Sequence, residues 1–387
     1  MATLNLNRKQ STRVQASVRF HFDYWLLLAI GALVIIGLLT VYSTTFDIGL
    51  QWKDDTTYYI RRQAIALFLG VGAFLFVMQF DYHILRRLSV PLLIITVGGL
   101  FATLFMGEAL LGSTRGLQGG SYSPSEVAKL TIILYIAHWL SSKGDRIKKV
   151  TYGLIPFSVI TGVVCSLIVQ QPDLSTATLI ALVSFTLFFI AGADWRQFAL
   201  AGILGGTVFT ALMLTFPHTL ARFTSYREAL TDPAKAGYQV QQTLAALGRG
   251  GWFGTGLGAS TQKFIPLPAG HTDGAFAILA EELGMLGSLL VIGLFALLVW
   301  RGIRTAMNAR DSYGALLAMG ITCWLGYQTL LNIAVITALI PVTGIPLPFI
   351  SYGGSSLAIS LVGAGILLNI SRDSGLVKRP QQQRRKQ

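Results

Sequence analysis

Long apolar runs alternate with short polar segments along most of the chain. Most of these runs approach or exceed the ~20 residues that an α-helix needs to cross the hydrocarbon core of a bilayer. The runs cover residues 25–43, 63–80, 88–106, 125–140, 152–169, 174–193, 198–216, 282–300, 313–338 and 356–370. The pattern predicts an all-α polytopic membrane protein with about ten transmembrane helices and one large extracytoplasmic loop, at about 217–281.

Composition and charge agree with this topology and indicate its orientation. The chain of 387 residues is 53% hydrophobic and only 12% charged, with a mean hydropathy of +0.60. An even number of crossings puts both termini on one side, and 20 of the 30 Lys and Arg residues fall in segments on that side. Because cytoplasmic segments carry such an excess, we expect both termini in the cytoplasm. The net charge of +13 then follows from topology, and we expect no nucleic-acid partner.

We expect a single membrane domain at 23–370 between two basic cytoplasmic tails, residues 1–22 and 371–387, that lie near anionic lipid. The first apolar run is too long for a removable signal and lacks a cleavage site, so we interpret it as the first span. Both cysteines, Cys165 and Cys323, fall inside predicted spans. We therefore expect neither a disulfide framework nor a cysteine metal site.

The large loop is rich in polar chemistry for so apolar a chain. The stretch 248–284 holds a glycine-rich segment followed by Lys263, His271, Asp273, Glu281 and Glu282. Ionisable groups at this density beside a membrane span indicate a functional site. The six glycines at 248–258 fit a flexible loop as well as a phosphate cradle, because no P-loop spacing is present.

Polar residues also gather at the ends of other predicted spans. Glu126 and Lys129 are three positions apart, so they share one helix face and could form a structural pair. Asp173 precedes the span 174–193 and could cap that helix. The segment 341–356 has three prolines and two adjacent glycines, which predict non-helical backbone that lines a cavity and faces the large loop.

Five long motifs occur in order: PSEVAKL at 124–130, QQPDLST at 170–176, GYQVQQTLAALGRGGWFGTGLGASTQK at 237–263, LPAGHTDGAFAILAEELG at 267–284 and PVTGIPLPFISYGGSSL at 341–357. In these motifs, and over nearly its whole length, the chain resembles the SEDS proteins (shape, elongation, division and sporulation), the polytopic bacterial family typified by RodA and FtsW. At positions 262 and 263, the pair Gln-Lys is slightly more similar to FtsW sequences than to RodA sequences.

The resemblance implies a peptidoglycan glycosyltransferase in the bacterial cytoplasmic membrane. Such an enzyme polymerises lipid II, a lipid-linked disaccharide-pentapeptide, on the outer face of that membrane. The resemblance also implies a partner, a class B penicillin-binding protein, which is a transpeptidase with one transmembrane helix. The aspartate that the family pattern marks as catalytic is Asp273 here, and Glu126, Lys129 and Asp173 match further functional positions. Arg62 matches a basic position more loosely.

The implied reaction joins an α-linked donor into a β-1,4 product and therefore inverts the anomeric carbon. It needs a general base near the acceptor hydroxyl, for which we expect Asp273, and positive charge near the leaving pyrophosphate. The expected substrate-binding residues are Arg62, Arg115, Glu126, Lys129, Asp173, Arg222, Arg249, Lys263 and His271. A divalent cation, Mg²⁺ or Mn²⁺, held by Asp273 with Glu126 or Asp173 could share the neutralisation of charge.

Several alternatives stay open. A Thr-Asp pair at the start of a helix is a common capping arrangement, and Gly274 and Ala275 replace the bulkier residues that usually follow this aspartate in the family. Ser123 likewise replaces a usual Gln or Lys. A lipid II flippase would need charges deep in its spans, whereas nearly all lie at span ends. A non-catalytic scaffold of the division or elongation complex would need no His-Thr-Asp motif.

Overall fold

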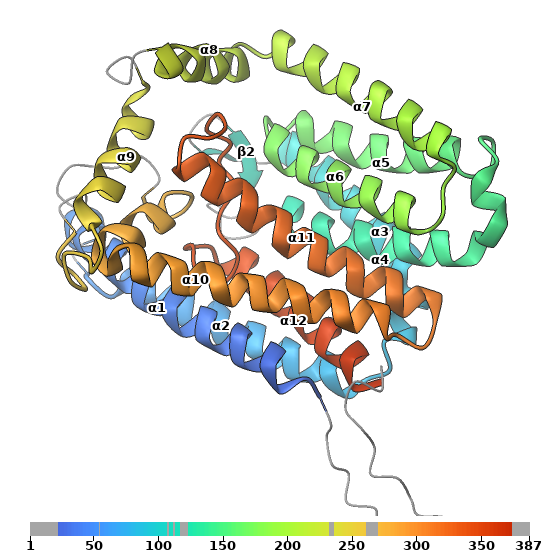
Figure 1. Ribbon diagram of the computed structural model, residues 1–387, viewed down its shortest axis with the longest axis horizontal. Coiled ribbons are helices and arrows are strands. Elements are labelled where there is room, and N and C mark those ends of the chain that lie inside the picture. Colours follow the sequence, from blue (N-terminus) through green and yellow to red (C-terminus); the bar gives the residue numbers. More distant parts are fainter. Residues whose placement is uncertain are drawn as a thin grey trace, which may run out of the picture.

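The computed structural model describes residues 22–53, 55–106, 108–110, 113–116, 123–231, 236–260 and 270–373. These residues form a bundle of long helices, and two shorter helices arch over one end of it (Figure 1). The elements are α1 (Tyr24–Lys53), α2 (Tyr58–Gln79), α3 (His83–Met106), β1 (Glu108–Leu110), β2 (Ser113–Gly116), α4 (Pro124–Lys143), the 3₁₀ helix η1 (Gly144–Lys148), α5 (Leu154–Val169), α6 (Leu174–Ile190), α7 (Trp195–Thr215), α8 (Pro217–Thr231), α9 (Tyr238–Gly250), α10 (Ala275–Met307), α11 (Ser312–Ile336) and α12 (Gly354–Asp373).

The expected polytopic helical fold is confirmed. Each predicted span coincides with one helix, in order α1 to α7 and then α10 to α12. Within the described residues, seven of these are long and apolar enough to cross a membrane, namely α1, α2, α3, α7, α10, α11 and α12. The apolar helices α5 and α6 are shorter. The number of ten crossings therefore stays a prediction.

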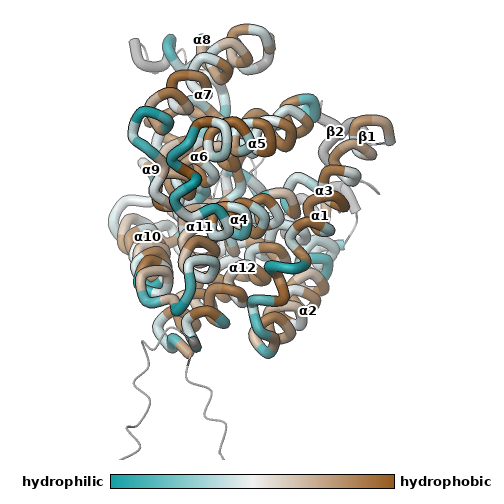
Figure 2. The backbone as a smooth tube through the Cα atoms, turned by 90° about the vertical axis from the view of Figure 1, so that its right-hand side faces the viewer, coloured by the Kyte–Doolittle hydropathy of each residue, from teal (hydrophilic) through white to brown (hydrophobic). Residues whose placement is uncertain are grey.

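The outer surface of the bundle is apolar, as a lipid-facing surface must be. Phe68 on α2 and Phe105 on α3 are 80% and 75% exposed, and in α7 Gln197 is the one buried residue. Figure 2 shows apolar colour running along the helices and hydrophilic colour gathered near their ends and connections. Exposed apolar area of this extent would be an aggregation hazard in water, but it costs nothing in a bilayer.

The chain enters the bundle beside the place where it leaves. The backbone N–H of Asp23, just before α1, donates to Ser371 Oγ near the end of α12, over 3.4 Å. Asp23 also caps α1, since its Oδ1 accepts from the amides of Trp25 and Leu26. Arg301 of α10 binds the other carboxylate oxygen, with Nε and Nη2 at 2.6 and 2.5 Å. This arrangement puts the start of α1 and the end of α12 at the same end of the bundle.

The large connection between α7 and α10 differs from the expected loop. It contains two helices, α8 and α9. The helix that contains the predicted span 282–300 begins earlier than that span, because α10 starts at Ala275. Gly284, at φ 68° and ψ −167°, breaks α10 into a short outer part and a long inner part. An all-α description also omits the short antiparallel pair β1 and β2.

Backbone hydrogen bonds explain this break in α10. The glycine-rich turn after α9 packs directly against it, with the amides of Thr255 and Gly256 donating to the carbonyls of Glu281 and Glu282 at 2.9 and 3.1 Å. A Cβ at Gly254 would lie 2.1 Å from the Glu282 carbonyl oxygen, which excludes any side chain there. The glycines at 250–258 thus allow two backbone segments to touch, and this contact gives them a structural role.

We expect Asp23→Ala to destabilise the protein strongly. The substitution leaves the Arg301 guanidinium, 14% exposed, without its carboxylate, and it removes the cap of α1, so the cost is about 3 kcal/mol. Thermal unfolding in detergent would register this as a lowered midpoint. Lys148→Ala is the matched control, because the Lys148–Asp145 pair is 62% and 96% exposed and contributes little. Equal midpoints for Asp23→Ala and wild type would contradict this role.

Candidate active site

The connection between α11 and α12, residues 337–353, lies at the end of the bundle away from the start of α1, and polar side chains of several elements contact it. The hydroxyl of Tyr226 on α8 donates to the Leu339 carbonyl at 2.6 Å, and Ser175 Oγ on α6 donates to the Thr343 carbonyl. At its far end, the amide of Gly353 donates to Gln63 Oε1 on α2 at 3.3 Å. The expected non-helical segment at 341–356 is confirmed over 341–353, since α12 begins at Gly354. Its contact with the large loop is confirmed by Tyr226 and by the bond from the Tyr352 amide to the His271 carbonyl, whereas the cavity stays a prediction. We call residues 337–353 the wall.

Asp273 lies against this wall. A Cβ placed on Gly344 would lie 3.2 Å from Asp273 Oδ2, so the carboxylate and the glycine face each other closely. Gly344 has φ +80°, a conformation that side chains with a Cβ rarely adopt. The N-cap residue of α10 is Gly274, not Asp273. A structural role for the Thr272–Asp273 pair at the start of this helix stays an open alternative to catalysis.

Two side chains of α11 hold the loops on both sides of the carboxylate. Asn332 Nδ2 donates to the carbonyls of Asp273, at 2.9 Å, and of Ile345, at 2.8 Å. One turn earlier, Gln328 Nε2 donates to the carbonyl of Pro346 at 2.8 Å. Both residues are buried, with exposed fractions of 1% and 0%. The backbone around Asp273 is thus fixed from within the bundle.

A group of aromatic rings lies next to Asp273. The rings of Tyr59, His271 and Tyr352 lie 5.4 to 6.2 Å from one another, and the Tyr352 amide donates to the His271 carbonyl at 2.9 Å. Arg62 lies beside Tyr352, and its guanidinium carbon lies 5.1 Å from the centre of the Tyr58 ring. Burial lowers the pKa of His271, because the protonated imidazole loses its water. His271 therefore packs as a neutral ring at pH 7.

The expected pair of Glu126 and Lys129 forms, but it is buried. Lys129 Nζ lies 2.8 Å from Glu126 Oε2 and also donates to Gln328 Oε1 at 3.1 Å. The side chain of Lys129 is 2% exposed, and its ammonium group lies 5.6 Å from the centre of the Trp324 ring. An ammonium group held by an acid, an amide and an aromatic face is already neutralised by protein.

Asp173 performs the capping role that its position predicts. Its two carboxylate oxygens accept from the amide and the hydroxyl of Thr176, at 3.1 and 2.9 Å, at the start of α6. Asp173 is 5% exposed. The same helix turn brings Ser175 onto the Thr343 carbonyl, so Asp173 supports the wall indirectly.

The expected cations have different environments. Arg222 on α8 is exposed, and its Nη1 lies 3.4 Å from the carbonyls of both Val342 and Thr343, next to Gly344. Arg249 on α9 instead lies 3.9 Å from the buried carboxylate of Glu281, which also accepts from Ser260 at 2.5 Å. Only the backbone of Arg115 is described, in β2, and Lys263 lies outside the described residues. The structure therefore brings Arg62 and Arg222 to the wall beside Asp273 and turns Arg249 toward Glu281.

The two glutamates at 281 and 282 face different partners, as their neighbouring positions on a helix predict. Glu281 binds Ser260 and Arg249, whereas Glu282 Oε1 accepts from Ser43 of α1 at 2.5 Å. Both are buried, at 0% and 3% exposed. Glu281 thus connects the short first part of α10 to α9, and Glu282 connects it to α1.

The carboxylates that the sequence offers as ligands for a divalent cation have protein partners of their own. Glu126 is paired with Lys129, and Asp173 caps α6. In the part of the chain that the structure describes, no group of three His, Cys, Asp or Glu side chains comes together. A bound Mg²⁺ or Mn²⁺ stays a prediction.

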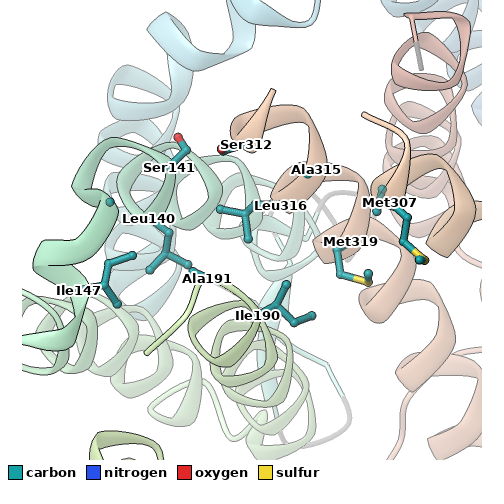
Figure 3. A pocket seen from close by; sticks show the side chains of 12 residues that line it. Leu140, Ser141, Ile147, Ile190, Ala191, Met307, Ser312, Ala315, Leu316 and Met319 are labelled. Carbon is teal, nitrogen blue, oxygen red and sulfur yellow. The ribbon is translucent and has the colours of Figure 1, made fainter. Parts of the chain in front are cut away.

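A cavity of about 360 Å³ lies between the last turn of α4 and the first turns of α11, at the end of α11 that is away from Asn332 and Asp273 (Figure 3). Leu140, Ile190, Leu316 and Met319 contribute to its lining, which contains no charged residue. An apolar cavity far from Asp273 does not suit a pyrophosphate-bearing substrate. The candidate site is therefore the region where Asp273 meets the wall.

Comparison with known proteins identifies the family. A family model described as cell cycle protein, for the FtsW, RodA and SpoVE group, matches residues 24–375. The stage V sporulation protein E of Bacillus subtilis is 41% identical over 357 residues, covering 91% of this chain and 97% of that protein. The chain belongs to the SEDS family. The probable peptidoglycan glycosyltransferase FtsW of Trichlorobacter lovleyi is 36% identical, covering 90% of this chain and 93% of its own length.

Solved structures of SEDS proteins agree with this fold. A chain from a structure entitled "Structural coordination of polymerization and crosslinking by a peptidoglycan synthase complex" matches with a TM-score of 0.74 and 25% identity. That match covers 91% of this chain and 98% of the other. The rod shape determining protein RodA of Thermus thermophilus matches with a TM-score of 0.67 and 26% identity, covering 92% and 98%.

Sequence reasoning missed Gln328, Asn332 and Gly344. The first two were visible as polar residues four positions apart inside an apolar span, a pattern that marks one polar face of a membrane helix. Gly344 carried no such signal, because its role depends on a positive φ and on a carboxylate that lies 71 positions earlier in the chain.

We expect Gly344→Ala to impair the site while the protein stays folded. The new Cβ would strain a backbone at φ +80°, costing about 1 kcal/mol, and would press on the Asp273 carboxylate. The rate of lipid II polymerisation by purified protein measures the effect and should fall well below that of wild type. Gly353→Ala is the matched control, because its Cβ would make only an ordinary 3.5 Å contact with Ser356. Unchanged rates for both variants would contradict the close approach.

We expect His271 to weaken the fold in acid. Because burial lowers its pKa in the folded state, the unfolded chain binds the extra proton below the ordinary pKa of 6.5. Stability should therefore fall as the pH drops through 6.5, and His271→Gln should flatten part of this dependence. Thermal midpoints above and below this pH provide the measurement. Identical slopes for wild type and His271→Gln would show that the ring stays accessible to protons.

Proposed function

We propose that this protein is a peptidoglycan glycosyltransferase that polymerises lipid II into β-1,4-linked glycan strands at the outer face of the bacterial cytoplasmic membrane. Membership of the SEDS family and the names of curated relatives support this activity. The observation that carries it for this chain is the position of Asp273, whose carboxylate meets Gly344 where two loops are joined by Asn332. The proposal includes a multi-pass topology with both termini in the cytoplasm.

Asp273 is the general base in this proposal. The acceptor sugar hydroxyl attacks the anomeric carbon of the donor and loses its proton to the Asp273 carboxylate as the new bond forms. The bond from that carbon to the pyrophosphate breaks, so the configuration inverts from α to β. A single carboxylate suffices because the hydroxyl becomes acidic only as the bond forms.

Positive charge for the departing pyrophosphate comes from the arginines at the wall. Arg222 is exposed and lies over the carbonyls of Val342 and Thr343, so it can rotate toward an anion. Arg62 lies at the opposite end of the same loop, beside Tyr352. Two separated arginines match the two pyrophosphates that must be held, one on the donor and one on the acceptor.

A partner protein belongs to the same proposal. One structural relative comes from a peptidoglycan synthase complex whose title joins polymerisation to crosslinking. A class B penicillin-binding protein, which would crosslink the new strand beside its site of synthesis, fits that combination. The purified protein should therefore be tested with its cognate transpeptidase present.

Gel analysis of glycan products from labelled lipid II tests the proposal. Wild type should make polymer, and Asp273→Asn, which keeps the side-chain shape but removes the base, should lose activity by about 10² or more. Asp194→Asn is a suitable control, because Asp194 caps α7 at the far end of the bundle. Equal polymer from wild type and Asp273→Asn would remove Asp273 from the mechanism. No polymer from either, in the presence of the partner, would favour a flippase or a scaffold.

A further inference from the structure

One polar face of α11 connects the buried ion pair to the wall of the site. Trp324, Gln328 and Asn332 follow one another at four-residue intervals and so lie along one side of the helix. Each is fully or almost fully buried, at 0%, 0% and 1% exposed. Polar side chains at this depth in a membrane protein are costly unless their hydrogen bonds are made, so their partners reveal what they hold.

The orientation of the Gln328 amide is fixed by two donors. Trp324 Nε1 donates to its Oε1 at 2.7 Å, and Lys129 Nζ donates to the same atom at 3.1 Å. Since neither donor can accept a hydrogen bond in return, the oxygen of the amide must face them. The Nε2 group is then left to donate to the Pro346 carbonyl, two residues after Gly344.

Asn332 joins the two loops through a single nitrogen. Its Nδ2 donates to the carbonyls of Asp273 and Ile345, and both acceptors require the nitrogen rather than the oxygen at that position. Its Oδ1 is buried without a hydrogen-bond partner among the described residues. Asn332 is thus oriented by the two carbonyl groups that its nitrogen binds.

We propose that Lys129, Gln328 and Asn332 are positioning residues that set the Asp273 carboxylate opposite Gly344. Lys129 acts through Gln328 and does not contact the pyrophosphate of lipid II, in contrast to the substrate-binding role that the sequence predicts for it. Its ammonium group forms an ion pair with Glu126 and donates a hydrogen bond to the oxygen of Gln328, both inside the protein. The expected effects on kcat rest on the proposed polymerase function. The expected effects on the two loops do not depend on it.

Isosteric substitutions test the hydrogen bonds of Gln328 and of Asn332 separately. Gln328→Glu keeps an oxygen for Lys129 and Trp324 but loses the donor to Pro346, and Asn332→Asp loses both donated bonds. We expect kcat to fall by about tenfold or more in each variant, with KM for lipid II within about twofold, because misplacement affects the reacting geometry and leaves substrate binding intact. Thr329→Val is the control on the same helix, since Thr329 Oγ1 bonds only the carbonyl of Leu325.

The role of Lys129 is tested by removing the ion pair as a unit. Glu126→Gln combined with Lys129→Met avoids leaving one buried charge without its partner. The positioning role predicts a lower kcat and an unchanged KM for this double variant. A KM raised by about tenfold or more with kcat preserved would show that Lys129 binds substrate, and it would overturn the proposal.

Hydrogen exchange of the full-length protein gives a readout that does not depend on activity. Asn332→Asp should speed exchange in both 270–274 and 341–353, Gln328→Glu only in 341–353, and Thr329→Val in neither. Wild-type exchange in both loops for both amide variants would overturn the positioning role. If wild type makes no polymer, these exchange patterns still decide the inference, so its failure and that of the proposed function are distinguishable. Should Asn332→Asp not fold, Gln328→Glu alone carries the test.

Discussion

The two hydrogen bonds donated by Asn332 are the interaction on which the candidate site depends. They join the backbone of Asp273 to that of Ile345, two segments separated by the whole of α10 and α11. Neither loop has regular secondary structure of its own to hold it in place. A carboxylate acting as a base must be held to within a fraction of an ångström, and this rigidity comes from the buried face of α11.

The membrane environment makes such a device both necessary and effective. Irregular backbone next to a bilayer needs partners for its carbonyl groups, and Asn332, Gln328, Ser175 and Tyr226 supply them from helices around the wall. The buried glutamates elsewhere in the bundle are also paired with polar groups of the protein. Each of Glu281, Glu282 and Glu126 has a hydroxyl or cationic partner, so these charges fix local geometry more than they offer free chemistry.

Sequence patterns predicted the fold well, because span-length apolar runs have few structural outcomes in a membrane protein. They also singled out Asp273 and the non-helical segment at 341–356, since glycines, prolines and ionisable groups stand out against an apolar background. They did not show that α10 begins at Ala275 and breaks at Gly284, because both features depend on backbone bonds to the glycine-rich turn after α9. For Lys129 and Arg249 the sequence shows the charge, but only the fold shows that Gln328 accepts a hydrogen bond from Lys129 and that Glu281 faces Arg249.

Chemical rescue tests the central claim, that Asp273 is a base held between two loops, most directly. Asp273→Ala leaves space for a small carboxylate, so polymerisation of lipid II by this variant would be measured with increasing formate. The account predicts little polymer without formate and a rate that rises with its concentration, because formate replaces the missing base. Polymerisation by Asp273→Ala at the wild-type rate without formate would contradict it.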